Sequence, residues 1–265
     1  MAEGINVRSE AQVGKITIDR PDKKNALTTQ MYADMADALD WIEDDDAIRV
    51  LLIGGGVDFT AGNDLKDFVT ASMGGTSFED LPVLRFLGRL RDFKKPVVAA
   101  VRGYAIGIGT TMLLHCDAVV AGDDARFRLP FVSLGLVPEA ASSLLLPLTV
   151  GRMRANWLLM AGETFYADDA LKMGLVTKVV DDLTVDSVAS EMAGTLTALP
   201  PAALRETKRL IRAPYVTQVA AQMEEEGRAF SNRLASEEFR EAAMRLLSPP
   251  TVQATPTILQ ERRTD

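Results

Sequence analysis

The stretch PVVAAVRGYAIGIGTT, residues 96–111, combines a continuous apolar run with three closely spaced glycines, Gly103, Gly107 and Gly109. The apolar run predicts a buried strand, and the glycines predict a turn that leads into a helix near Thr110. Such a turn lets the backbone approach a ligand closely, and the first N–H groups of a helix favour negative charge. The spacing matches neither a dinucleotide fingerprint nor a phosphate loop. Close packing of a helix on a strand is the alternative explanation.

Short apolar runs alternate with helical periods along the rest of the chain. Apolar residues recur at helical spacing from Leu27 to Ile42, which predicts one buried helix face. Strands are expected at 13–19, 48–55, 96–101, 117–122 and 175–180, and helices at 26–44 and 78–93. This alternation predicts an α/β fold rather than a helical bundle or a sandwich.

The pattern changes after Ala198, where Leu199, Pro200 and Pro201 interrupt the chain. Residues 1–198 are therefore expected to form a core that carries the active site. Residues 199–265 are expected to form a C-terminal helical region for oligomerisation or pocket closure. The last 18 residues contain three prolines and no periodicity, so they are expected to be loosely ordered.

Composition excludes several classes of protein. The 265 residues are 47% hydrophobic and 25% charged, which is typical of a soluble protein, and the net charge of −8 argues against a general nucleic-acid binder. No apolar run approaches the ~20 residues that cross a bilayer, and the first residues lack a signal-peptide pattern. With single residues His115 and Cys116, the chain has neither an internal disulfide nor a Cys/His metal site. A cytoplasmic protein without membrane insertion is expected.

Two further stretches have residues suited to chemistry. The loop DFTAGNDLKD, residues 58–67, follows an expected strand, and ligands in α/β sheets usually bind at the carboxyl ends of strands. A plain connection is its alternative explanation. Glu139 lies in LGLVPEAASS within a mainly apolar stretch, so its pKa is expected to be raised into the range of a general base. Alternatively, it is an acidic residue at the start of a helix.

Four blocks of sequence carry a family resemblance. RPDKKNAL, DFTAGNDL, GYAIGIG and LGLVPEAASS, in this order and at these separations, resemble the enoyl-CoA hydratase/isomerase family, also called the crotonase family. The resemblance extends from about Val13 to about Val180. It implies a crotonase-like spiral of ββα units with a C-terminal helical region. It also implies a homotrimer or homohexamer.

The resemblance also implies roles for individual residues. The backbone N–H groups of Asn63 and Ile108 match an oxyanion hole that binds the thioester oxygen of an acyl-CoA, and the coenzyme A is then part of the substrate rather than a separate cofactor. Lys24 and Lys66 are either local positive charges for that anionic group or solvated surface lysines. The expected substrate-binding residues are Lys24, Ala26, Leu27, Ala61, Gly62, Asn63, Asp64, Leu65 and Gly107.

Departures from the family pattern select the expected reaction. The two glutamates of typical hydratases are replaced by Thr111 and Phe131, whereas Glu139 matches the single glutamate of 3-enoyl-CoA to 2-enoyl-CoA isomerases. The expected function is isomerisation through a proton shuttle by Glu139, without a metal. Another crotonase reaction such as hydration, with Glu139 or Asp64 activating water, and a non-catalytic acyl-CoA-binding protein are the alternatives. His115 and Cys116 are expected to serve packing.

Overall fold

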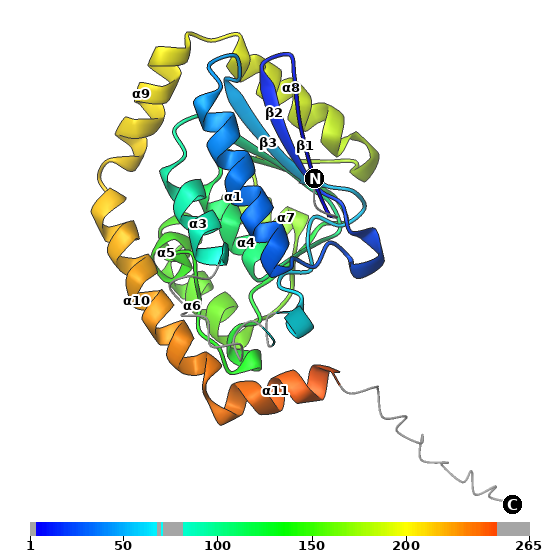
Figure 1. The fold of residues 1–265 in the computed structure, drawn as a ribbon, viewed down its shortest axis with the longest axis vertical. Coiled ribbons are helices and arrows are strands. Elements are labelled where there is room, and N and C mark those ends of the chain that lie inside the picture. Colours follow the sequence, from blue (N-terminus) through cyan, green and yellow to red (C-terminus); the bar gives the residue numbers. More distant parts are fainter. Residues whose placement is uncertain (1–3, 68–69, 71–81, 248–265) are drawn as a thin grey trace, which may run out of the picture.

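The computed structural model describes residues 4–67, 70 and 82–247, and it has a mixed α/β fold (Figure 1). One sheet consists of β1 (Ile5–Glu10), β2 (Val13–Ile18), β3 (Val50–Gly55), β4 (Val97–Val101), β6 (Ala118–Gly122) and β9 (Lys178–Val180). A second, smaller sheet consists of β5 (Tyr104–Ile106), β7 (Arg126–Arg128) and β8 (Phe165–Tyr166). The helices are α1 (Thr29–Asp44), α3 (Pro82–Asp92), α4 (Ile108–Thr111), α5 (Ser142–Val150), α6 (Arg152–Ala161), α7 (Ala167–Met173), α8 (Val185–Thr197), α9 (Pro201–Arg212), α10 (Val216–Leu234) and α11 (Glu237–Leu247).

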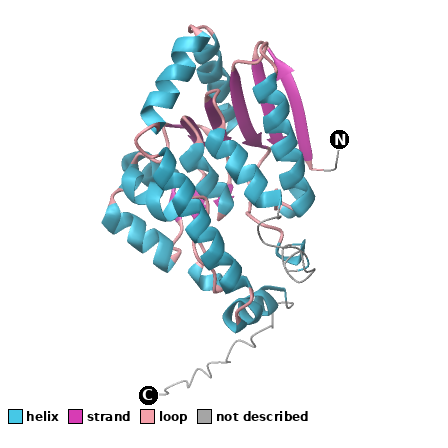
Figure 2. Cartoon of the chain, turned by 60° about the vertical axis from the view of Figure 1, so that its left-hand side comes forward, coloured by secondary structure: helices cyan, strands magenta, loops and turns pink. Residues whose placement is uncertain are grey.

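The larger sheet is covered by helices on both faces. Its order is β1-β2-β3-β4-β6-β9, and all neighbouring strands are parallel except β1 and β2. Helix α1 covers one face and α8 the other (Figure 1). Figure 2 shows the helices packed around the sheet. Leu51 and Ile53 of β3 belong to the main core with α1 and α3, while Leu52 belongs to a second cluster with Val185 and Ala189 of α8. Burial on both faces explains why these strands are continuous apolar runs rather than alternating ones.

The chain passes from the larger sheet to the smaller one through a sharp turn at Gly103. Its φ is +53°, and a Cβ there would lie 2.3 Å from Oδ1 of Asp58, so the turn requires a glycine. β4, β5 and α4 then form one ββα unit, and β1, β2 and α1 form another. Repetition of this order produces the expected spiral, and the α/β fold class is confirmed.

The C-terminal helices α9, α10 and α11 run along one side of the molecule and past one end (Figure 1). Lys208 of α9 is 7% exposed and joins this region to the core. Its Nζ donates to the carbonyl of Lys95 at 2.6 Å and to the carboxylate of Asp117 at 2.7 Å. Helix α10 packs against α5, and α11 packs against residues 132–134. The expected helical character of the tail is confirmed, and residues 248–265 lie outside the described part.

The expected strands and helices are found with slightly different ends. In the described part the second helix begins at Pro82, and the short helix after the glycine turn begins at Ile108 rather than near Thr110. The sequence patterns did not predict β1, β5, β7, β8 or the helices α6 to α8, whereas α5 agrees with the alternative explanation that a helix starts near Glu139. Within the described ranges, no helix has both the length and the apolar character that crossing a bilayer requires.

Candidate active site

Three segments that are distant in sequence are joined by backbone hydrogen bonds. Thr60 N–H donates to Tyr104 O at 2.8 Å, and Ile106 N–H donates back to Thr60 O at 3.0 Å. Leu27 N–H donates to Gly62 O, and Asp64 N–H donates to Leu27 O, both at 2.8 Å. The loop after β3 is therefore held between residues 24–27 and the glycine turn.

This pairing leaves the N–H groups of Asn63 and Ile108 free. Asn63 is paired with Leu27 in an isolated parallel bridge, in which the hydrogen bonds are made by the adjacent residues Gly62 and Asp64. The N–H of Asn63 itself therefore points away from Leu27. Ile108 is the first residue of α4, where N–H groups have no partner within the helix. Among the described residues, neither N–H has a hydrogen-bond partner. Both residues line the same cavity.

Two glycines let these loops approach each other. Gly62 has φ of +89°, and a Cβ there would lie 2.8 Å from the carbonyl oxygen of Ile106. Gly107 has φ of +56° and directly precedes Ile108. A side chain at Gly62 would separate the two loops, and a β-branched residue at Gly107 would strain the turn. The glycines therefore bring the two residues with free N–H groups to the same cavity.

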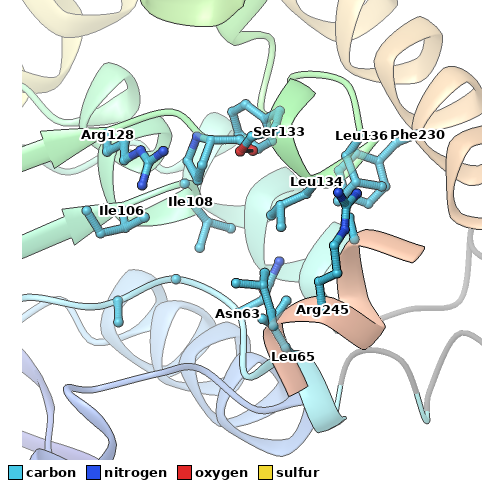
Figure 3. Close-up of a pocket in the computed structure, with 17 residues that line it drawn as sticks. Asn63, Leu65, Ile106, Ile108, Arg128, Ser133, Leu134, Leu136, Phe230 and Arg245 are labelled. Carbon is cyan, nitrogen blue, oxygen red and sulfur yellow. Dashed lines mark hydrogen bonds between the residues drawn. The ribbon is translucent and has the colours of Figure 1, made fainter. Parts of the chain in front are cut away.

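The first cavity has a volume of about 460 Å³. Figure 3 shows Asn63 on one side of it and Ile108 and Arg128 on the opposite side. Arg245 of α11 and Phe230 of α10 lie at the right-hand side of this view, so the C-terminal helices contribute to the wall. Of the substrate-binding residues expected from sequence, the cavity wall includes Ala61, Gly62, Asn63, Leu65 and Gly107.

Lys24, Ala26, Leu27 and Asp64 are not part of this cavity wall. Leu27 is buried in the core, and Lys24 is exposed with its Nζ 4.2 Å from the centre of the Tyr104 ring. The carboxylate of Asp64 accepts hydrogen bonds from Arg20 at 2.8 Å and from the backbone of Lys66 and Asp67. These residues shape and support the loops, whereas the open space lies beside their neighbours.

Tyr32 of α1 supports the Asn63 loop, a contact that the sequence patterns did not predict. Its ring packs against Phe86 of α3, and its hydroxyl donates to Oδ1 of Asn63. Burial, followed by the charges of Glu139 and Asp67, holds the pKa of Tyr32 well above its ordinary range. The hydroxyl therefore stays protonated and remains a donor that fixes the Asn63 side chain.

Glu139 lies in a strained turn immediately before α5. Ala140 and Ala141 have φ of +60° and +54°, a conformation that costs about 1–3 kcal/mol for a residue with a side chain. Ser142 N–H donates to Glu139 O at 3.0 Å, and Nε2 of His115 donates to Ala140 O at 2.8 Å. Burial lowers the pKa of His115 to about 4, so the ring is neutral near pH 7. His115 therefore has a structural contact at this turn, in agreement with its expected packing role.

The carboxylate of Glu139 is shielded from solvent although the residue as a whole is partly exposed. Its Oε1 accepts a hydrogen bond from the hydroxyl of Thr111, and its Oε2 is buried without a partner among the described residues. Burial raises the pKa of Glu139 to about 8, the Thr111 hydrogen bond opposes this shift, and the charge of Glu226 adds to it. The raised pKa expected from the apolar sequence around Glu139 is confirmed.

Glu139 borders a second cavity rather than the one lined by Asn63 and Ile108. This cavity has a volume of about 690 Å³ and lies between α3 and α10. Two contacts connect it to the first. Thr111 binds Glu139 from the end of α4, the helix that begins at Ile108, and Tyr32 binds Asn63 while lying close enough to Glu139 for its pKa to respond. Glu139 and the two free N–H groups thus border different cavities and are linked through Thr111 and Tyr32.

The sequence of this chain matches one known protein family over most of its length. The family model described as enoyl-CoA hydratase/isomerase matches residues 8–247. The chain belongs to this family. The expectation from the four sequence blocks is therefore confirmed, and the matched range extends through the C-terminal helices of this family member.

Individual relatives are named either as isomerases or as hydratases. The chain is 40% identical to enoyl-CoA delta isomerase 2 of Rattus norvegicus over 92% of its own length, and it spans 63% of the length of that relative. It is 33% identical to 2,3-dehydroadipyl-CoA hydratase of Escherichia coli, covering 92% of this chain and 96% of the relative. A solved enoyl-CoA hydratase/isomerase from Pseudoalteromonas atlantica has a TM-score of 0.86 and 45% identity, covering 92% and 96% of the two chains.

Proposed function

We propose that this family member isomerises a 3-enoyl-CoA to a trans-2-enoyl-CoA, with Glu139 as the only proton-transfer group. The observation that carries the proposal is a buried carboxylate with a pKa of about 8 whose partner Thr111 belongs to α4, the helix that begins with the free N–H group of Ile108. A general base works best when its pKa is near the working pH. The similarity to a relative named enoyl-CoA delta isomerase 2 supports the same reaction.

The chemistry requires a proton acceptor and a stabilised oxyanion. The carboxylate of Glu139 removes a proton from C2 of the substrate, and the electrons move to the thioester oxygen to form a dienolate. The N–H groups of Asn63 and Ile108 donate to that oxygen. The same carboxyl group then returns the proton to C4, so the double bond moves from C3–C4 to C2–C3 and no atom is gained or lost.

The residues around Glu139 favour isomerisation over hydration. Addition of water requires one group that activates the water and one that protonates carbon. Asp64 is a poor candidate for the first role. Burial alone would raise its pKa, but hydrogen bonds from Arg20 and the backbone outweigh burial and lower it. The positions of the usual hydratase acids hold Thr111, which binds Glu139, and Phe131, which is buried.

Hydration is the second candidate function, and the similarity to 2,3-dehydroadipyl-CoA hydratase supports it. Incubation of the purified protein with a 3-enoyl-CoA and, separately, a 2-enoyl-CoA distinguishes the two. Isomerisation predicts that the 3-enoyl-CoA is converted without a change in mass. Chromatography detects this conversion, because the two isomers are separated. Gain of one water by the second substrate would instead establish a hydratase. Binding of both thioesters without turnover would contradict an enzymatic role.

The pH dependence of the reaction is expected to report the ionisation of Glu139. The free protein must lose the proton with a pKa of about 8 before the carboxylate can accept one from C2. Therefore kcat/KM for the 3-enoyl-CoA is expected to rise with pH and level off above about pH 8. A profile that is already level above pH 5 would show that the base has an ordinary carboxyl pKa and is not this buried group.

A further inference from the structure

Glu226 of α10 is a second buried carboxylate near the site, and the proposed reaction assigns it no role. The residue is 5% exposed. Its Oε1 accepts hydrogen bonds from the backbone N–H of Ser143 at 2.9 Å and from the Ser143 hydroxyl. Gln222, one turn earlier on α10, donates to Ser143 Oγ at 2.8 Å. Within the described part of the chain, Oε2 of Glu226 is buried without a partner.

These contacts hold the end of the turn that carries Glu139. Ser143 is the second residue of α5, and the strained residues Ala140 and Ala141 directly precede that helix. A strained backbone persists only where its surroundings fix it. His115 binds the middle of the turn through Ala140 O, and Glu226 binds its C-terminal side through Ser143. Without the α10 contact, the first turn of α5 would lose an N-terminal acceptor.

Glu226 and Glu139 also border the same cavity of about 690 Å³. Besides burial, the charge of Glu226 raises the pKa of Glu139, because two buried carboxylates disfavour each other's ionisation. Burial raises the pKa of Glu226, and its hydrogen bonds from Ser143 and Ala141 oppose that shift. Among the described residues, Tyr32 of α1 and neutral His115 also lie close to Glu139 or its turn. Other charged groups at the cavity are Arg91 of α3 with its partner Asp92, and Glu224 and Arg228 of α10.

We propose that Glu226 is a positioning residue for proton transfer: it fixes the turn that carries Glu139, and its negative charge favours the protonated state of Glu139. This inference rests on the proposed function. Removal of a substrate proton leaves Glu139 protonated next to a dienolate, and the proton must remain available for return to C4. A neighbouring negative charge stabilises that intermediate state of Glu139 and makes it a stronger base.

Three variants separate charge from anchoring. Glu226→Gln removes the charge and keeps an oxygen that accepts from Ser143. Glu226→Asp keeps the charge but shortens the side chain. Glu225→Gln is the matched control, because Glu225 is the neighbouring residue on α10, is exposed and pairs with Arg228 on the same helix surface.

Ionisation of Glu139 is measured directly by infrared spectroscopy on protein labelled with 13C-glutamate. The band of the protonated carboxyl group is assigned to Glu139 by its absence in Glu139→Gln, and its intensity is followed as a function of pH. In Glu226→Gln, the midpoint of this band is expected to move to lower pH by on the order of half to one unit. The rise of kcat/KM is expected to move with it. Glu226→Asp is expected to keep both midpoints near those of the unmodified protein while lowering kcat more than it changes KM. Glu225→Gln is expected to change none of these quantities.

An infrared midpoint of Glu139 that stays unchanged in Glu226→Gln would overturn the inference, as would an equal shift in Glu225→Gln. Failure of the proposed function has a different signature. If Glu139→Gln keeps full isomerase activity, then Glu139 is not the base. The infrared titration still decides whether Glu226 controls its ionisation. If Glu139→Gln loses activity but Glu226→Gln leaves the infrared midpoint of Glu139 unchanged, the inference about Glu226 is contradicted while the proposed function stands.

Discussion

Glu139→Gln is expected to lower isomerase turnover by about 10²–10⁴-fold, because the amide can neither accept the proton from C2 nor deliver it to C4. The same change is expected to stabilise the fold at alkaline pH. Glu139 has a pKa of about 8 in the folded protein and an ordinary value of 4.5. The folded state therefore holds a proton that the unfolded state has lost, and the resulting contribution to stability is complete below about pH 4.5 and lost as pH rises through 8.

The measurement is denaturant unfolding of both proteins at a series of pH values, together with steady-state kinetics. The free energy of unfolding of Glu139→Gln minus that of the unmodified protein is expected to increase from pH 5 and to level off above pH 8. The increase is on the order of 3–5 kcal/mol, because each unit of pKa shift corresponds to about 1.4 kcal/mol. A difference that is independent of pH would contradict a buried, proton-holding carboxyl group at this position.

Ile108→Pro is expected to lower kcat/KM by about 10²–10³-fold, because proline removes one of the two N–H groups proposed to bind the thioester oxygen. Position 108 is the first residue of α4, where proline is tolerated. The preceding residue is Gly107, whose lack of a side chain avoids the usual clash with proline. The variant is therefore expected to fold and to lose the oxyanion contact.

The matched control is Ile108→Val, which keeps the N–H group and a β-branched side chain. Its kcat/KM is expected to stay within a few-fold of that of the unmodified protein. Circular dichroism and the pH titration of Glu139 establish that the proline variant retains the fold and the neighbouring site. A proline variant that retains full kcat/KM would show that the N–H of Ile108 does not bind the reacting oxygen.

The central strands β3 and β4 of the larger sheet could be predicted from sequence because they are buried on both faces. The runs at 48–55 and 96–101 are continuous and apolar, and they stand out from the amphipathic helix between Leu27 and Ile42. The smaller sheet could not be predicted, since β8 has two residues and β5 and β7 have three. Strands this short have no periodicity, and their pairing depends on the approach of distant segments.

The same distinction applies to the candidate site. The free N–H groups and Glu139 lie in local motifs, so sequence blocks pointed to them. The supporting contacts are formed between distant segments. Tyr32 reads as one more residue of a helix, and Glu226 as one of three consecutive glutamates on a polar helix. Only the packing of α1 and α10 shows that each of these side chains is buried with a partner in the site.

The contact between Ser143 and Glu226 spans 83 positions of the chain. During synthesis from the N-terminus, the turn with Ala140 and Ala141 leaves the ribosome well before its partner helix. That turn contains two left-handed alanines, so its unassisted conformation is unfavourable. All strands of the larger sheet precede α10 in the chain, the last of them being β9. The cavity beside Glu139 is therefore completed only after α10, the last of its lining elements in the chain, has been synthesised and can dock.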